Sequence, residues 1–429
     1  MNFAYTKKVF SSGLKVVFRQ MNSPLVAVNL WARVGVKDEE PTKVGISHFF
    51  EHMVFKGTKN YPGFELPRQV QAIGGSMNAG TSLDTTDFYI VVPTEHWEKS
   101  LDLITELVLN PLFDPIEIER EKNVIIHEIH LDEDDPEEKI TTTLYQEVFS
   151  GTPYERSILG AQDTITQLQR EDLFHHQKTF YHPANLTMVV CGKVPEDQLY
   201  EKIDQYFKNW GEPLNNSFNL FPAFPKAQKK RIEIGMDVHY HYGTIGFLGP
   251  GIKQEDFYLL KFLSIILGDG IDSRLNARLR EKEQLVDSIH TNCSGYQESG
   301  IFSIIYTFDQ SDPQKIEDII QEEFENLLNH PPQEVEMNRA KNLLLSGFYH
   351  SIETTLGSAE LLGRLDTIDT IDVIFRYLRN IQNIRIDHIN EVLRKYLDFN
   401  YAKCVIIYPK NTVTSESLVG SRESIVKRR

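Results

Sequence analysis

The sequence lacks the features that most quickly assign a chain to a class. Its three cysteines form no CxxC pair, which argues against a disulfide framework and predicts buried, reduced thiols of a cytosolic protein. No apolar run approaches the roughly 20 residues that span a bilayer. The first ten residues have no apolar core, and no glycine-rich phosphate-binding motif occurs in the chain. We therefore expect neither a membrane anchor nor a secretory signal.

Positive charge is also scarce. Acidic residues number 61 against 45 lysines and arginines, which gives a net charge of −16. This balance argues against a nucleic-acid partner, although an acidic protein can attract basic peptides. A hydrophobic fraction of 41% is typical of a soluble globular protein, and 429 residues suffice for two or more domains. We expect a cytoplasmic protein with no nucleic-acid or membrane partner.

The chain contains two halves with a similar order of predicted elements. In each half strands come first, then a helix, two more strands, further helices and a closing strand. A segment with three prolines, residues 211–225, separates them. The pattern predicts an α+β protein with two homologous α/β-sandwich halves, each a mostly antiparallel sheet covered by helices. The predicted divisions are an N-terminal domain over 1–212, a linker over 213–230 and a C-terminal domain over 231–429.

One short segment carries the strongest chemical signal. Residues 45–57 predict a helix in which His48 and His52 are four positions apart, so both imidazoles project from the same face. This spacing can place two nitrogens on one metal ion, but a solvated helix face can have it too. Glu51 can reach the same region without being a ligand. The pattern HxxEH is the inverted form of the zincin motif.

A hydrolytic zinc site needs a third protein ligand. A helix is predicted to begin at Asp114, because an N-cap aspartate is followed by proline at the first helical position. On that helix Glu121 and Glu128 are two turns apart and share a face. The candidates for the third ligand are Glu121, His127, Glu128 and His130.

These residues together resemble the M16 (pitrilysin-type) metallopeptidases, the inverzincins. Glu128 follows His52 at the distance typical of that family, and residues 74–81 are similar to its GG-x-x-NA-x-T strand. Further matches extend the resemblance over about residues 10–408. The chain length resembles that of the short subfamily, which includes bacterial processing proteases and the zinc-bearing subunit of mitochondrial processing peptidase.

The resemblance implies a zinc-dependent endopeptidase that hydrolyses peptides or unfolded peptide precursors. His48, His52 and Glu128 would bind Zn²⁺, and Glu51 would act as the catalytic general base. Glu128 is favoured as the third ligand because His127 points about 100° away from it on a helix.

Three more residues gain expected roles from the resemblance. Glu121 would support the catalytic site as a carboxylate that orients a histidine; the alternative is a surface salt bridge. Residues 76–82 would form an edge strand beside the metal, to which an extended peptide adds through its main chain. On that strand Asn78 and Ala79 are the implied substrate-binding positions.

The sequence departs from the family pattern in its second half. Active members carry an arginine and a tyrosine, spaced R-x-x-x-x-x-x-Y, that hold the substrate carbonyl near zinc. Arg280 keeps the arginine, but Asp287 stands where tyrosine belongs, and Gln284 replaces the usual glycine. An aspartate there would repel a developing oxyanion. We therefore expect a heterodimer in which a second M16-like subunit supplies Arg and Tyr; a homodimer that uses another donor is the alternative.

A different class also stays open. Some relatives are non-catalytic subunits that serve as scaffolds in larger complexes. Those typically lose part of the zinc motif, whereas His48, Glu51, His52 and Glu128 are all present here. The intact motif favours an enzyme, and metal content distinguishes the two classes.

Overall fold

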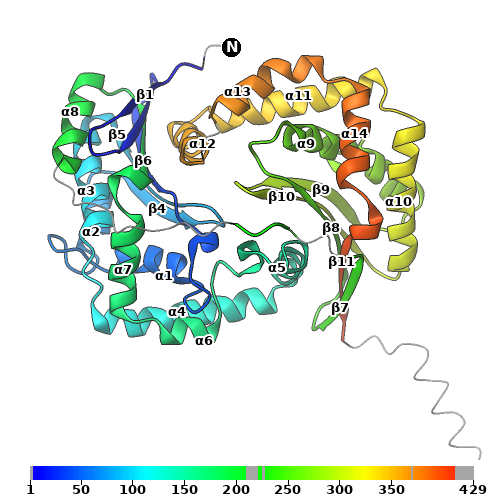
Figure 1. Ribbon diagram of the computed structural model, residues 1–429, viewed down its shortest axis with the longest axis horizontal. Coiled ribbons are helices and arrows are strands. Elements are labelled where there is room, and N and C mark those ends of the chain that lie inside the picture. The colour runs from blue at the N-terminus through cyan, green and yellow to red at the C-terminus, as the bar shows by residue number, and fades with distance from the viewer. Residues whose placement is uncertain (1–2, 209–220, 225–227, 369–370, 411–429) are drawn as a thin grey trace, which may run out of the picture.

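The computed structural model describes residues 3–208, 221–224, 228–368 and 371–410, which form two halves side by side (Figure 1). One sheet organises each half. In spatial order, the strands of the first sheet are β1 (Thr6–Val9), β2 (Lys15–Gln20), β6 (Leu186–Gly192), β3 (Leu25–Ala32), β5 (Thr86–Pro93) and β4 (Ser76–Thr81). The strands of the second sheet are β7 (Lys230–Met236), β11 (Lys403–Pro409), β8 (His241–Pro250), β10 (Ser299–Phe308) and β9 (Ser288–Gly295).

The two sheets share one topology. A parallel pair, β2 with β6 or β7 with β11, is followed in each sheet by three antiparallel pairings. The order β2-β6-β3-β5-β4 in the first half thus corresponds to β7-β11-β8-β10-β9 in the second, and β1 is an addition at the edge. The predicted α+β class, with two similar and mostly antiparallel halves, is confirmed.

Helices cover the sheets on both faces. The helices of the first half are α1 (Ile46–Val54), α2 (Glu65–Ala72), α3 (Trp97–Leu109), α4 (Pro115–Asp134), α5 (Pro136–Val148), α6 (Gln162–Gln167), α7 (Arg170–Phe180) and α8 (Glu196–Phe207). Those of the second half are α9 (Glu255–Gly268), α10 (Pro313–Asn329), α11 (Glu334–Ser351), α12 (Thr355–Thr367), α13 (Ile371–Asn380) and α14 (Ile386–Tyr396). A π-helix, Asn276–Lys282, precedes β9.

Two helix starts follow directly from the local sequence. The side chain of Asp114 accepts a hydrogen bond of 2.8 Å from the backbone N–H of Ile116, so it caps α4. Asp135 accepts a bond of 2.8 Å from the N–H of Glu137 and caps α5 in the same way. Each cap is followed by a proline at the first helical position, where its missing N–H costs nothing. The predicted N-cap at Asp114 is present.

One helix from each half packs on the sheet of the other half. Helix α12 packs on β3 and β6 of the first sheet, and α5 packs on β8 and β11 of the second (Figure 1). Both contacts need a glycine. A Cβ on Gly363 of α12 would lie 2.0 Å from Nε1 of Trp31, and a Cβ on Gly246 of β8 would lie 2.7 Å from Cδ1 of Leu144 in α5.

This exchange qualifies the predicted division of the chain. The proposed linker, 213–230, lies largely outside the described residues. The sheets occupy separate halves of the sequence, but each sheet is covered by a helix from the other half. We keep domains over 1–212 and 231–429 as a proposal, with the addition that α5 and α12 cross between them.

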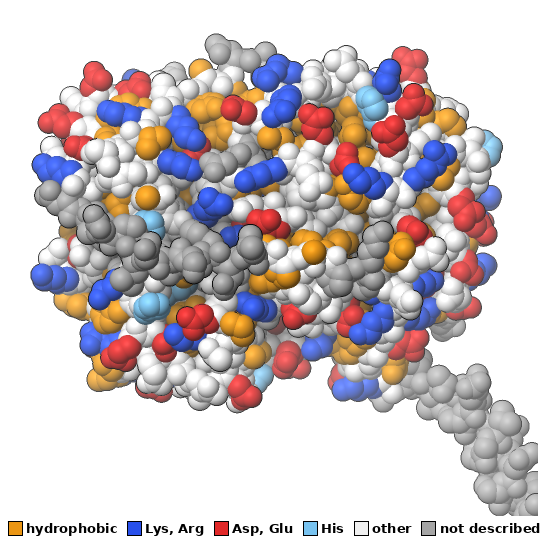
Figure 2. All heavy atoms as spheres, viewed as in Figure 1, with side chains coloured by type: hydrophobic (Ala, Val, Ile, Leu, Met, Phe, Trp, Pro, Cys, Tyr) orange, Lys and Arg blue, Asp and Glu red, His pale blue; other side chains and the backbone are white. Residues whose placement is uncertain are grey.

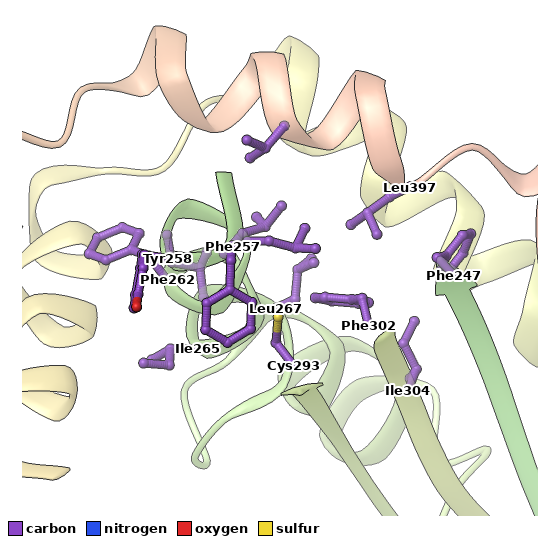
Figure 3. Packing of buried hydrophobic residues seen from close by; sticks show 14 of the residues in the cluster. Phe247, Phe257, Tyr258, Phe262, Ile265, Leu267, Cys293, Phe302, Ile304 and Leu397 are labelled. Atoms are coloured by element: carbon purple, nitrogen blue, oxygen red, sulfur yellow. The ribbon is translucent and has the colours of Figure 1, made fainter. Parts of the chain in front are cut away.

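The largest core cluster joins the two halves. In the second half Phe262 and Leu267 of α9 lie toward Phe302 of β10 (Figure 3). The same cluster includes Trp31 and Val189, which belong to the first sheet. Full burial of such side chains stabilises a fold by about 1.5–3 kcal/mol each. Much of this apolar stabilisation is therefore available only when both halves are assembled.

The three cysteines are buried and form no disulfide with one another. Cys191, Cys293 and Cys404 are therefore free, as predicted, and burial raises the pKa of each thiol to about 12. Acidic and basic side chains are interspersed over the face shown in Figure 2. Within the described ranges, no helix combines the length and apolar composition needed to cross a membrane.

We predict a pH-dependent loss of stability that originates at His176. This residue of α7 packs against the rings of Phe50, Phe180 and Tyr181, and burial lowers its pKa to about 3. The unfolded chain binds a proton below about pH 6.5, whereas the folded chain resists it, so the contribution to stability is present above pH 6.5 and lost as pH falls. Between pH 7.5 and 5.5 the loss from this group is about 1.4 kcal/mol.

Urea unfolding at these two pH values measures the effect. A His176→Phe variant should lose less stability than the wild type on acidification, by about the same 1.4 kcal/mol. His175→Phe, at the exposed neighbouring position, is the control and should keep the wild-type pH dependence. Identical pH dependence in wild type and His176→Phe would contradict the assignment.

Candidate metal centre

Helix α1 presents its two histidines because its other face is apolar. Phe50 and its apolar neighbours on the helix point into the core of the first half. At the start of the helix, the buried carboxylate of Glu39 accepts a hydrogen bond of 2.7 Å from the backbone N–H of Gly45. The remaining face carries His48 and His52, whose ring centroids lie 4.5 Å apart.

Helix α4 brings the third candidate ligand to these histidines. One ligand atom from each of His48, His52 and Glu128 lies within 4.8 Å of the others. Oε2 of Glu128 is 3.7 Å from Nε2 of His52. His127 and His130, the other imidazoles considered on this helix, are exposed to solvent and lie outside this group.

The state of these side chains fits a divalent metal ion. Burial lowers the pKa of His48 to about 3, with the neighbouring His52 adding to the effect, so His48 is neutral as a ligand must be. Its Nδ1 is buried without a hydrogen-bond partner. Two imidazoles and one carboxylate form a ligand set found in catalytic zinc sites, which leave a fourth position for water.

Glu121 connects the two helices beneath this group. Its buried carboxylate accepts hydrogen bonds of 2.9 Å from Nδ1 of His52 and 2.6 Å from Nζ of Lys56. Burial raises the pKa of Glu121, but these two bonds outweigh burial and lower it. Because Nδ1 of His52 donates to a carboxylate, its Nε2 is left to face Glu128.

The side chain of Glu51 extends from α1 to the edge strand. Oγ1 of Thr81, at the end of β4, donates a hydrogen bond of 2.7 Å to Oε2 of Glu51. Burial raises the pKa of Glu51, and the bond from Thr81 and the proximity of His52 only partly oppose the rise. A carboxyl group with a raised pKa beside a metal group is suited to accept and return a proton.

The predicted edge strand is present. β4 is the last strand of the first sheet, and its pairing with β5 leaves the other side of β4 open in the described part of the chain. Asn78 is exposed, whereas Ala79 packs against the core beneath the sheet. The open side supplies main-chain groups that an extended peptide can bind.

The second-half positions considered from the sequence, Arg280, Gln284 and Asp287, lie on and after the π-helix. Arg280 is half-exposed on the π-helix, and its guanidinium lies 3.9 Å from the carboxylate of Glu281 on the same element. Gln284 has a φ of 52°, a left-handed conformation that favours glycine and explains why glycine is usual there. Asp287 is exposed, and its backbone N–H donates to the carbonyl of Thr307.

Two supporting contacts were not predicted from the sequence. Lys56 follows His52 by four positions and lies in the turn just after α1, where its ammonium group reaches Glu121. That spacing was a usable signal. The hydroxyl of Thr81 reaches Glu51 only through the pairing of β4 with β5, which sequence spacing does not reveal.

Comparison with known proteins places this architecture in a family. The model described as insulinase (peptidase family M16) matches residues 15–162, and that described as the peptidase M16 inactive domain matches residues 167–344. A Rickettsia felis protein named "Uncharacterized zinc protease" is 30% identical over 340 residues, which cover 79% of this chain and 81% of that protein. "Uncharacterized zinc protease YmxG" of Bacillus subtilis is 27% identical over 347 residues, which cover 80% of this chain and 83% of that protein.

Solved structures share the fold. A protease from Helicobacter pylori has a TM-score of 0.89 at 22% identity and covers 95% of this chain and 100% of that chain. A structure from Pseudomonas fluorescens, described as a peptidase M16 inactive domain, has a TM-score of 0.86 at 18% identity and covers 95% and 98%. Fold and site define a peptidase-like protein with a candidate metal group in its first half. The chain belongs to the insulinase (M16) peptidase family, as the sequence motifs predicted.

The contact between Glu121 and His52 predicts a loss of metal affinity on substitution. In Glu121→Gln the side chain keeps its shape but no longer holds His52 by a charged hydrogen bond, so zinc affinity should fall by roughly 10- to 100-fold. Competition with a chromogenic chelator measures this affinity. Glu133→Gln, at an exposed position of the same helix, is the control and should bind zinc as the wild type does. Unchanged zinc affinity in Glu121→Gln would show that Glu121 does not support the metal site.

Proposed function

We propose that the chain is a zinc-dependent endopeptidase that hydrolyses peptides or unfolded peptide precursors. The observation that carries this proposal is that the side chains of His48, His52 and Glu128 meet around one point. Glu51 lies on the same helix as the two histidines. The relatives named zinc proteases support the choice of metal.

In this proposal His48, His52 and Glu128 hold Zn²⁺. The bound ion supplies Lewis acidity that makes hydrolysis by water possible near neutral pH. Glu51 is the general base, and Thr81 holds its Oε2, so Oε1 is free to take the proton from the attacking water. The same carboxyl group then returns the proton to the leaving amine. Glu121 is a positioning residue that keeps the imidazole of His52 oriented.

The substrate binds as an added strand. A peptide in extended form pairs with the open side of β4 at Asn78 and Ala79, and Thr81 at the end of the strand lies next to Glu51. Main-chain pairing tolerates varied side chains, which suits an enzyme that accepts unfolded peptides rather than folded proteins.

The chain is proposed to act as the zinc-bearing subunit of a heterodimer. Arg280 is half-exposed and Asp287 is exposed, and Asp287 carries a negative charge where the family uses tyrosine to stabilise a developing oxyanion. A second M16-like subunit would supply the Arg and Tyr. A homodimer with another donor remains the alternative assembly.

The role of Glu51 can be tested without losing the metal site. Glu51→Gln removes the base but none of the three ligands, so it should keep its zinc and lose kcat by roughly 10²- to 10⁴-fold. Zinc content by atomic absorption and cleavage of a quenched fluorescent peptide measure the two effects.

Chelation is the matched control, because it should abolish cleavage by the wild type and zinc should restore it. Near wild-type cleavage by zinc-loaded Glu51→Gln would contradict the assignment of the base. A wild-type protein that holds no zinc after zinc-replete expression would instead favour the non-catalytic scaffold class.

The dependence on a partner is a separate prediction. The purified chain alone should cleave peptides slowly, and addition of a co-encoded M16-like protein should raise kcat/KM by roughly 10²-fold, because an oxyanion donor is worth about that much. Titration of the partner at fixed chain concentration measures the effect. Full activity of the chain alone, unaffected by the partner, would refute the heterodimer.

A further inference from the structure

Three residues lie in one row across the first sheet. The antiparallel registers pair Trp31 of β3 with Asp87 of β5, and Asp87 with Gly80 of β4. Cross-strand partners share a face of the sheet. This face is the one that α12 covers, since Gly363 meets Trp31 there. The next residue of β4, Thr81, points to the opposite face and binds Glu51.

The missing side chain at Gly80 leaves Asp87 accessible from the open edge of the sheet. Within 4 Å of the point where a Cβ of Gly80 would lie, the described residues beyond its chain neighbours place only Oδ1 of Asp87, at 3.5 Å. The carboxylate therefore leans over Gly80 toward the free side of β4. Any residue that pairs with Gly80 from an added strand would face this carboxylate with nothing between them.

A cavity lies over this row. It has a volume of about 330 Å³ and is lined by Trp31, Gly80 and Asp87 from the first half and by Tyr296 and Arg364 from the second. The guanidinium of Arg364 donates to the backbone carbonyl of Gly295. The lining of the cavity thus combines the aromatic rings of Trp31 and Tyr296 with carboxylates of the first half, Asp84 and Asp87, and with Gly80 of the edge strand β4.

Among the described residues, no lysine or arginine forms an ion pair with Asp87, and Arg364, which lines the same cavity, donates to the carbonyl of Gly295 instead. The groups that shift the pKa of Asp87 are, apart from burial, the amide of Asn29 and the carboxylates of Glu360 and Glu51, and none of these is a cation. Burial is the largest cause and raises the pKa to about 7. A partly buried carboxylate without a cation is unfavourable for the fold, which is typical of a group that meets its partner in a ligand.

We propose that Asp87 is the specificity-determining carboxylate of a subsite that receives a lysine or arginine side chain of the bound peptide, at the substrate residue opposite Gly80. This inference rests on the proposed binding of a peptide to β4. Neighbouring strands lie about 4.8 Å apart, so this residue is two strand spacings from Asp87. The long stem of lysine or arginine can cross Gly80 to reach the carboxylate, whereas the α-amino group of a peptide cannot.

Trp31 contributes the end of the subsite. Its indole is the next member of the row beyond Asp87, and α12 holds it in place through the close contact at Gly363. A flat aromatic side chain beside a carboxylate is a favourable surface for the stem and the charge of a basic side chain. Because the substrate residue over Thr81 is the neighbour of the one over Gly80, the subsite lies beside the reacting centre.

Peptide binding tests the proposal independently of hydrolysis. All variants are made in the zinc-loaded full chain carrying Glu51→Gln, with its partner present. Fluorescent, N-acetylated peptides place a single lysine, or the neutral isostere norleucine, at each position in turn. We expect one position at which lysine binds at least about tenfold tighter than norleucine. No preference at any position would overturn the subsite.

Two variants test whether the preference for lysine depends on Asp87 and Gly80. Asp87→Asn should remove most of the preference for lysine. Gly80→Val should do the same with Asp87 still present, because its side chain fills the path, and the strand conformation at Gly80 accepts valine. Asp197→Asn, at an exposed position of α8, is the charge-matched control and should keep the preference. A preference that survives in both Asp87→Asn and Gly80→Val would overturn the assignment.

The same peptides separate this inference from the proposed function. Wild-type chain with its partner should cleave the lysine peptide with a higher kcat/KM than the norleucine peptide. Lysine-selective binding without cleavage of any peptide would leave the subsite standing and reject the hydrolytic function. Cleavage that is indifferent to lysine at every position would support hydrolysis and reject the subsite.

Discussion

One buried carboxylate determines how the candidate metal centre is built. Glu121 of α4 lies against α1, and it holds His52 of α1 and Lys56 of the turn after α1 at the same time. Breaking a buried ion pair by removing one partner typically costs about 3–5 kcal/mol, so this contact is a strong constraint on the helix crossing. The crossing in turn sets the distance from Glu128 to the two histidines. Helix packing and ligand geometry therefore cannot be varied separately.

The two faces of the edge strand β4 have different roles in the proposed site. On one face Thr81 contacts Glu51, where the proposed proton transfer takes place. On the other face Gly80 opens onto Asp87 and the cavity shared with the second half. A peptide strand alternates its side chains between these faces, so adjacent substrate residues would experience reaction and recognition separately. The second half thus contributes a wall to the proposed substrate site, whereas the three candidate metal ligands found among the described residues all come from the first half.

The features of the site that were predicted correctly from the sequence depend on local spacing along the chain. The i, i+4 histidines, the N-cap at Asp114 and the shared face of Glu121 and Glu128 are short-range features, and the structure has each of them. The row of Trp31, Asp87 and Gly80 could not be predicted, because it depends on the register of three neighbouring strands whose order in the sheet, β3-β5-β4, differs from their order in the sequence. The packing of α12 against Trp31 could not be predicted either, because hydrophobic periodicity does not show which sheet a helix will cover.

The exchange of α5 and α12 has a consequence for how the protein is made. A ribosome completes the first sheet long before it reaches α12, so the indole of Trp31 and the apolar residues around it stay uncovered while the second half is synthesised. The first half can build the core on the other face of its sheet by itself, but the face that α12 covers is completed only when the second half has been made. Truncation of the chain before α12 would therefore expose an apolar sheet face, and such a face promotes aggregation.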